Sequence, residues 1–174
     1  MIAVKFCECD TNRESQHNTG RQLLFYMLKD LCGIDKCDIM HTDSGKPYLE
    51  NAVFSLSHSD TLAACAVVTD IKKEDYLYFE GDPAEIGIDV EILKENKERH
   101  QKIAERYFSK EEIKRLEEAQ NYSREFLKLW TKKEAFIKCT GNGLKDIRKP
   151  LPDGIITKVL NIKDQTVILS ICTK

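Results

Sequence analysis

The chain has 174 residues, of which 41% are hydrophobic, with 27 basic and 29 acidic side chains and a formal net charge of -2. This size and composition predict a soluble globular protein of one domain or two small packed halves. The near balance of charge excludes a global attraction to nucleic acid or to an anionic membrane. No apolar run reaches the length of a membrane span and no secretory segment is recognisable, so we expect a cytoplasmic protein.

Strand and helix signals alternate in the first half of the chain. Met1 to Cys7 has the loose alternation of a strand, and Arg13 to Cys32 carries apolar residues at helical spacing before a glycine. Two apolar runs, Ala52 to Leu56 and Leu62 to Val68, predict a hairpin with the polar residues Ser57 to Asp60 at its bend.

The second half begins with a predicted strand, Ile86 to Ile92. Ser109 and Glu112 have the spacing of a capping box at a helix start, and a second helix is predicted from about Ser123 to Cys139. The tail, Gly154 to Cys172, predicts a closing hairpin.

Both halves run strand, helix, strands, without a detectable sequence repeat. We therefore predict an α+β fold with an N-terminal half, residues 1–84, and a C-terminal half, residues 85–174. The boundary lies in the charged segment 71–85, which predicts a connecting loop with at most an edge strand. The role of residues 60–85 as a whole stays open.

Seven cysteines are scattered mostly among apolar neighbours and form no C-x-x-C pair, so we expect free, reduced thiols. Cys7 and Cys9 would lie on one face of a strand, but no second ligand pair with zinc spacing accompanies them. We therefore expect no structural metal at these cysteines.

The strand from Ile86 to Ile92 alternates strictly, so that Gly87, Asp89 and Glu91 share one face. Two carboxylates on one face repel each other unless they are solvated or a cation lies between them. Both interpretations are open from this segment alone. Gly87 favours the cation site, because it leaves room for something to approach the backbone.

Glu134 and Lys138 form an i, i+4 pair on the second helix. Such pairs are commonly surface salt bridges, with Lys133 here a solvated neighbour. Alternatively, Glu134 is a third carboxylate, and the two lysines bind phosphate oxygens. Three carboxylates suit magnesium better than zinc. The apolar face of this helix should point to the core with Phe126, Leu129, Trp130 and Ile137.

Ser57 and His58 do not indicate a serine hydrolase, because there is no G-x-S-x-G motif and neighbours in sequence are poorly placed to form a nucleophile and its base. His58 taken alone is more often a hydrogen-bonded structural residue. Lys46 and Pro47 taken alone indicate a turn, and Arg21 a surface position on the first helix.

Taken together, several segments in the same order closely resemble the Sfp-type phosphopantetheinyl transferases. The two most specific are G-I-D-x-E and W-x-x-K-E-A-x-x-K. A weaker match at Arg21 to Leu24 resembles the first helix of that family. The five main segments are Gly45 to Pro47, Phe54 to Ser59, Ile86 to Glu91, Arg106 to Ser109 and Trp130 to Lys138.

The resemblance implies a pseudo-dimer of two similar α+β halves with the site in the cleft between them. It implies that magnesium is held, together with the pyrophosphate of coenzyme A, by Asp89, Glu91 and Glu134. It implies coenzyme contacts at Arg21, Lys46, Pro47, Ser57, His58, Lys133 and Lys138. The residues with catalytic roles would be Asp89, Glu134 and Lys138.

The implied reaction transfers 4'-phosphopantetheine from coenzyme A to a serine of an apo acyl or peptidyl carrier protein, as in enzymes of the holo-acyl-carrier-protein synthase type. Such a step depends on positioning and charge neutralisation. Our hypothesis is that Glu134 accepts the serine proton, directly or through a metal-bound water. The alternative is a magnesium-dependent pyrophosphatase acting on coenzyme A or a nucleotide. A non-catalytic binding partner ranks last, because all three carboxylates are present.

The chain departs from typical Sfp-type sequences in two places. Only twenty residues precede Arg21, so we expect a weaker grip on the adenine end of the coenzyme. The segment between His58 and Asp89 is longer, so the choice of carrier can differ. Which carrier is modified is not determined by sequence. We expect a monomer, since two halves in one chain can complete a site.

Overall fold

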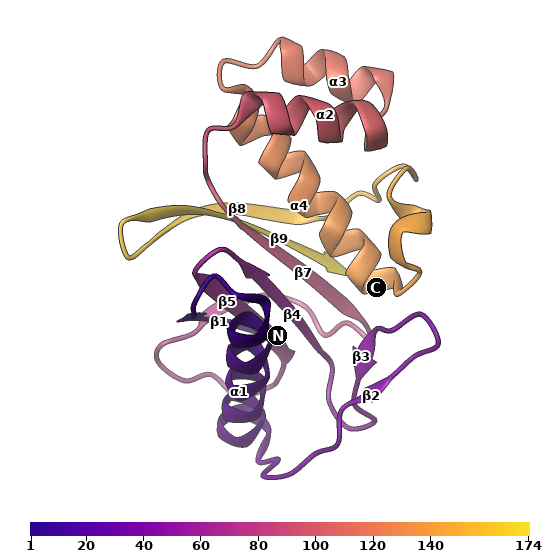
Figure 1. The fold of residues 1–174 in the computed structure, drawn as a ribbon. Coiled ribbons are helices and arrows are strands. Elements are labelled where there is room, and N and C mark those ends of the chain that lie inside the picture. The colour runs from indigo at the N-terminus through magenta and orange to yellow at the C-terminus, as the bar shows by residue number, and fades with distance from the viewer.

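The computed structural model describes residues 1–174 and contains two main antiparallel sheets with helices packed against them (Figure 1). The strand order is β4-β5-β1-β6 in the first sheet and β7-β9-β8 in the second, while β2 and β3 pair separately. The strands and helices are β1 (Ile2–Glu8), α1 (Arg13–Cys32), β2 (Met40–His41), β3 (Pro47–Tyr48), β4 (Phe54–Ser59), β5 (Leu62–Val68), β6 (Leu77–Phe79), β7 (Ile86–Ile92), α2 (Lys97–Tyr107), α3 (Lys110–Glu117), α4 (Tyr122–Thr140), the 3-10 helix η1 (Gly143–Asp146), β8 (Ile156–Ile162) and β9 (Gln165–Thr173).

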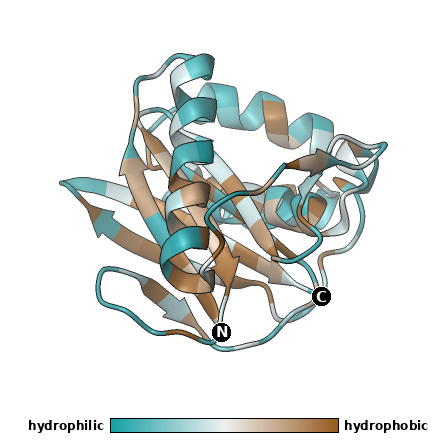
Figure 2. Cartoon of the chain, turned by 90° about the horizontal axis from the view of Figure 1, so that it is seen from below, coloured by the Kyte–Doolittle hydropathy of each residue, from teal (hydrophilic) through white to brown (hydrophobic).

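The core lies between the two sheets. Alternate side chains of β1, β5, β7 and β9 point to this core, and the others point to the helix that covers the opposite face. Val4, for example, contacts the shared core, whereas Ala3 packs with α1. Figure 2 shows the apolar colours concentrated along the strands. The fully buried residues of the shared core are Ile2, Val4, Ala64, Ala66, Ile86, Ile88, Val90, Val167, Leu169 and Ile171.

These layers confirm the predicted α+β fold. The helix from Arg13 to Cys32 has the predicted bounds, and Gly33 ends it in the left-handed conformation, with φ of 69°. The capping box of Ser109 and Glu112 is present in full at the start of α3. The equivalence of the two halves as a pseudo-dimer, and the boundary after residue 84, stay predictions.

The sequence predicted the wrong end for strand β4. Ser57, His58 and Ser59 were expected at the bend of a hairpin, but they continue β4, in register with β5, and the turn falls at Asp60 and Thr61. Asp60 adopts a positive φ of 52° there. A run of polar residues is tolerated in this strand because β4 is an edge strand, and its serines bond to a neighbour outside the sheet.

The remaining predictions concern the end of the chain, the cysteines and the membrane. The closing hairpin is confirmed: β8 and β9 meet at Lys163 and Asp164, both with positive φ. All seven cysteines are free. None of the helices combines the length and the apolar character that crossing a membrane requires.

Candidate active site in the cleft between the sheets

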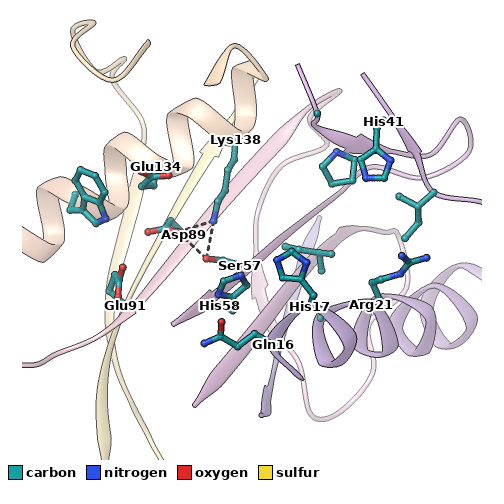
Figure 3. Close-up of a pocket in the computed structure, with 16 residues that line it drawn as sticks. Gln16, His17, Arg21, His41, Ser57, His58, Asp89, Glu91, Glu134 and Lys138 are labelled. Atoms are coloured by element: carbon teal, nitrogen blue, oxygen red, sulfur yellow. Dashed lines mark hydrogen bonds and ion pairs between the residues drawn. The ribbon is translucent and has the colours of Figure 1, made fainter. Parts of the chain in front are cut away.

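A cleft of about 530 Å³ opens between the two halves of the molecule. Figure 3 shows β7 and α4 on one side of it and α1 and β4 on the other. Most of its lining side chains are polar, which suits an anionic ligand and its counter-ions better than an apolar one. The lining residues include His17, Arg21, Pro47, Ser57, His58, Asp89, Glu91, Trp130, Glu134 and Lys138.

Strand β7 presents Asp89 to this cleft. The side chain is only 8% exposed, and its Oδ1 accepts hydrogen bonds from Ser57 Oγ at 2.8 Å and from Lys138 Nζ at 2.7 Å. The other oxygen, Oδ2, is buried and has no partner at all. A buried carboxylate oxygen without a partner is costly in a protein, and it is a free donor for a cation.

Two further carboxylates line the same cleft. Burial, reinforced by the charge of Asp89, raises the pKa of Glu91 to about 7. Burial and Asp89 also raise the pKa of Glu134, which lies on α4. The charge of Asp89 therefore opposes the ionisation of both glutamates, and a cation near Asp89 would relieve that repulsion.

Lys138 is the cation that the structure itself supplies. Its Nζ donates to Asp89 and, at 2.9 Å, to Ser57 Oγ, so it joins α4 to β7 and β4. The interpretation of Glu134 and Lys138 as a surface salt bridge is therefore wrong. Both side chains point into the cleft, where the lysine bonds to Asp89 of β7 on its own side and to Ser57 of β4 on the other (Figure 3).

The donor set of this cleft fits a magnesium ion. No three histidine, cysteine, aspartate or glutamate side chains converge as a ready-made metal cluster. Magnesium, however, is commonly bound through one or two carboxylates plus substrate phosphates and water. Asp89 offers a buried oxygen without a partner, and Glu91 and Glu134 offer further oxygen ligands nearby.

The residues predicted to contact a coenzyme have different surroundings. Arg21, Pro47 and His58 line the cleft. Burial and the charge of Lys138 lower the pKa of His58. Lys46 lies in an adjoining cleft of about 250 Å³, where its Nζ pairs with Glu85 at 2.5 Å and donates to the carbonyl of Cys139 at 2.8 Å.

The sequence comparisons identify the family. A family model described as the 4'-phosphopantetheinyl transferase superfamily matches residues 85–173, a segment that contains β7 and α4. The chain belongs to this superfamily. The segment matched thus carries all three carboxylates and Lys138, which confirms the family resemblance expected from the motifs.

Curated members of the superfamily resemble the chain over most of its length. The 4'-phosphopantetheinyl transferase Sfp of Bacillus subtilis (strain 168) is 33% identical over 150 residues, which are 79% of this chain and 58% of Sfp. The 4'-phosphopantetheinyl transferase HetI of Nostoc sp. is 29% identical over 140 residues, 75% of this chain and 53% of HetI. The chain thus spans little more than half the length of these relatives.

One predicted phosphate ligand of this superfamily member, Lys133, is not in the cleft. It is 2% exposed, and its Nζ pairs with Glu112 at 2.9 Å and donates to the carbonyl of Ile147 at 3.1 Å. Each residue advances about 100° around a helix, so Lys133 faces α3 and the segment after η1, whereas Glu134 and Lys138 face the cleft. The expected solvated position is also wrong.

We predict that Lys133→Met lowers the free energy of unfolding by about 2–4 kcal/mol, because it leaves a buried carbonyl and a carboxylate without their partner. Urea unfolding measures this loss. Lys132→Met is the matched control, since Lys132 forms no ion pair, and should change stability by less than about 0.5 kcal/mol. Unchanged stability of the Lys133 variant, with weaker phosphate binding, would restore the phosphate role.

Sequence reasoning missed several residues of the cleft. His17, one helical turn before Arg21, lies with its ring centroid 5.5 Å from that of His58. Its spacing of four residues from Arg21 was a signal that could have found it. Trp130 was expected in the core, but it is only partly buried and lines the cleft while stacking on Phe126.

Proposed function

We propose that the protein transfers the 4'-phosphopantetheine group of coenzyme A to a serine of an apo carrier protein, with magnesium, and releases adenosine 3',5'-bisphosphate. One observation carries the proposal: Asp89 of β7 and the pair Glu134 and Lys138 of α4 line one cleft, with a buried Asp89 oxygen left free for a cation. Family membership and the Sfp and HetI relatives support the same reaction.

In this proposal Asp89, Glu91 and Glu134 hold magnesium. The ion would neutralise charge on the pyrophosphate and so make the leaving group better. The all-oxygen donor set supports magnesium rather than zinc. The raised pKa values of Glu91 and Glu134 are consistent with carboxylates that ionise fully only beside a cation.

Coenzyme A would lie along the part of the cleft opposite the carboxylates. Arg21, Pro47, Ser57 and His58 would contact its nucleotide and phosphates, with Lys46 at the adjoining opening. The Lys138 side chain is 30% exposed, so its ammonium can also reach a phosphate in the cleft. A lysine there offsets the charge that develops on the leaving phosphate.

The transfer forms one bond and breaks one. The carrier serine oxygen attacks the phosphorus that bears pantetheine, and the bond between that phosphorus and the bridging oxygen of the pyrophosphate breaks. The serine loses its proton as this happens, and we assign its acceptance to Glu134. The position of Glu134 in the cleft, on the helix that also carries Lys138, supports this role, since a general base must lie within reach of the proton that it accepts.

The acceptor would be an apo acyl or peptidyl carrier protein, so the activity would be of the holo-acyl-carrier-protein synthase type. Residues from both halves of one chain line the cleft, which supports a monomer as the active unit. The choice between carriers depends on surface complementarity with the partner.

The test is to incubate the protein with coenzyme A, magnesium chloride and an apo acyl or apo peptidyl carrier, and to weigh the carrier by mass spectrometry. The expected result is a carrier heavier by one phosphopantetheine group, with an equal amount of adenosine 3',5'-bisphosphate. Carriers whose acceptor serine is alanine should gain no mass. Cleavage of coenzyme A at the same rate without carrier would contradict the transferase and indicate a pyrophosphatase.

A further inference from the structure

Three serines recur at alternate positions of β4 and point to the edge of the other sheet. They are Ser55, Ser57 and Ser59, and the strand that they meet is β7 (Figure 1). Because β4 and β7 are each the outermost strand of their own sheet, the two edges face each other without backbone pairing. The serine hydroxyls accept the hydrogen bonds that the carbonyls of a neighbouring strand would otherwise accept.

Each hydroxyl accepts a backbone N–H of β7. Ile88 donates to Ser55 at 3.0 Å, Val90 donates to Ser57 at 3.2 Å, and the N–H of Ile92 donates to Ser59 at 3.3 Å. Outward N–H groups of a buried edge strand must find such acceptors, since leaving them unpaired is costly. The three serines thus share one structural role.

The three serines differ in the group to which each hydroxyl donates its own hydrogen bond. Ser59 Oγ donates to Glu91 Oε2 at 2.5 Å, and Ser57 Oγ donates to Asp89, whereas Ser55 donates to no carboxylate. Ser57 also touches Lys138, so its effects are mixed. Ser59 is the only side chain hydrogen-bonded to the Glu91 carboxylate, which makes no ion pair.

We infer that Ser59 is a positioning residue that fixes the Glu91 carboxylate toward the cation site of the cleft. The inference rests on the magnesium site of the proposed function. The Ile92 N–H holds the Ser59 oxygen in place, so the single hydroxyl proton has a fixed direction toward Glu91. Hydrogen bonds to a carboxylate ligand select one orientation before the ion arrives, and their loss commonly weakens metal binding 10–100-fold.

The experiment measures Mn²⁺ binding to the free protein by electron paramagnetic resonance, with Mn²⁺ as the probe for magnesium and no turnover. We expect Ser59→Ala to bind Mn²⁺ about 10-fold more weakly than wild type. Ser55→Ala is the matched control: it also removes one acceptor of a β7 N–H, but it leaves both carboxylates untouched, and its Mn²⁺ affinity should not change. Ser59→Thr, which keeps the hydroxyl, should restore the affinity.

A double-mutant cycle with Glu91→Gln tests whether Ser59 acts through Glu91. Ser59→Ala should weaken Mn²⁺ binding no further once Glu91 has lost its charge. Equal losses for Ser59→Ala and Ser55→Ala, or a full additional loss in the Glu91→Gln background, would overturn the positioning role and leave the transferase intact. Absence of Mn²⁺ binding in wild type, both alone and with coenzyme A but no carrier, would instead remove the metal site of the proposed function, and the positioning role with it.

Discussion

Asp89→Asn is expected to lower the rate of phosphopantetheine transfer by about 10³-fold or more while the protein stays folded. Asparagine has almost the same shape, so Ser57 and Lys138 keep an oxygen to bond. What is lost is the negative charge and the free buried oxygen that would bind the cation. The measurement is initial rate of carrier modification at saturating coenzyme A, together with Mn²⁺ binding.

The control for Asp89→Asn is Asp30→Asn. Asp30 also pairs with a lysine, Lys73, and accepts from Tyr76, but it is not among the residues that line the cleft. Its replacement should leave the transfer rate within about twofold of wild type. If Asp89→Asn kept more than a tenth of the activity and still bound Mn²⁺, Asp89 would not be a metal ligand and the proposed site would have to be redrawn.

The parts of the site that sequence could predict follow from local periodicity. Strict alternation in β7 placed Asp89 and Glu91 on one face, and i, i+4 spacing in α4 placed Glu134 and Lys138 on one face. Strand and helix periods fix which side chains share a face whatever packs against it. The fold class followed from the order of such elements.

The misplaced residues depend on partners that are distant in sequence. Lys133 is buried because Glu112 on α3 and the carbonyl of Ile147 both bond to it. The sequence around Lys133 does not predict either partner. Ser57 and Ser59 look like turn residues, since nothing in β4 itself reveals that β7 will offer N–H groups to their hydroxyls. Contacts between the halves decide these positions, and local spacing cannot.

The segment that sequence left without a role acquires a structural one. Part of it, β6, adds an edge strand to β1, in agreement with the edge strand allowed for residues 71–85. Tyr76, just before that strand, donates to Asp30 on α1 at 2.9 Å. The segment therefore ties one edge of the first sheet to its covering helix, at the edge opposite β4.

Gly87→Ala is expected to lower the free energy of unfolding by about 3 kcal/mol or more. Gly87 lies on the carboxylate face of β7, and sequence suggested that it leaves room for something to approach. That neighbour is the backbone of α4: a Cβ at this position would stand 2.1 Å from the carbonyl oxygen of Ala135 and 2.3 Å from the amide nitrogen of Cys139. Backbone atoms cannot rotate aside, so the whole helix must move.

Gly20→Ala is the matched control for this effect. Gly20 lies within α1, its added Cβ would meet nothing within 4 Å, and alanine is the better helix former, so stability should stay equal or rise by up to about 1 kcal/mol. Urea unfolding followed by circular dichroism compares the two variants. A displaced α4 should also exchange its amide hydrogens faster, because it packs less tightly on β7. The displacement would move Glu134 and Lys138, which α4 carries. A Gly87→Ala protein as stable as wild type would mean that α4 can slide over β7. Close packing at Gly87 would then not be what fixes the positions of Glu134 and Lys138 in the cleft.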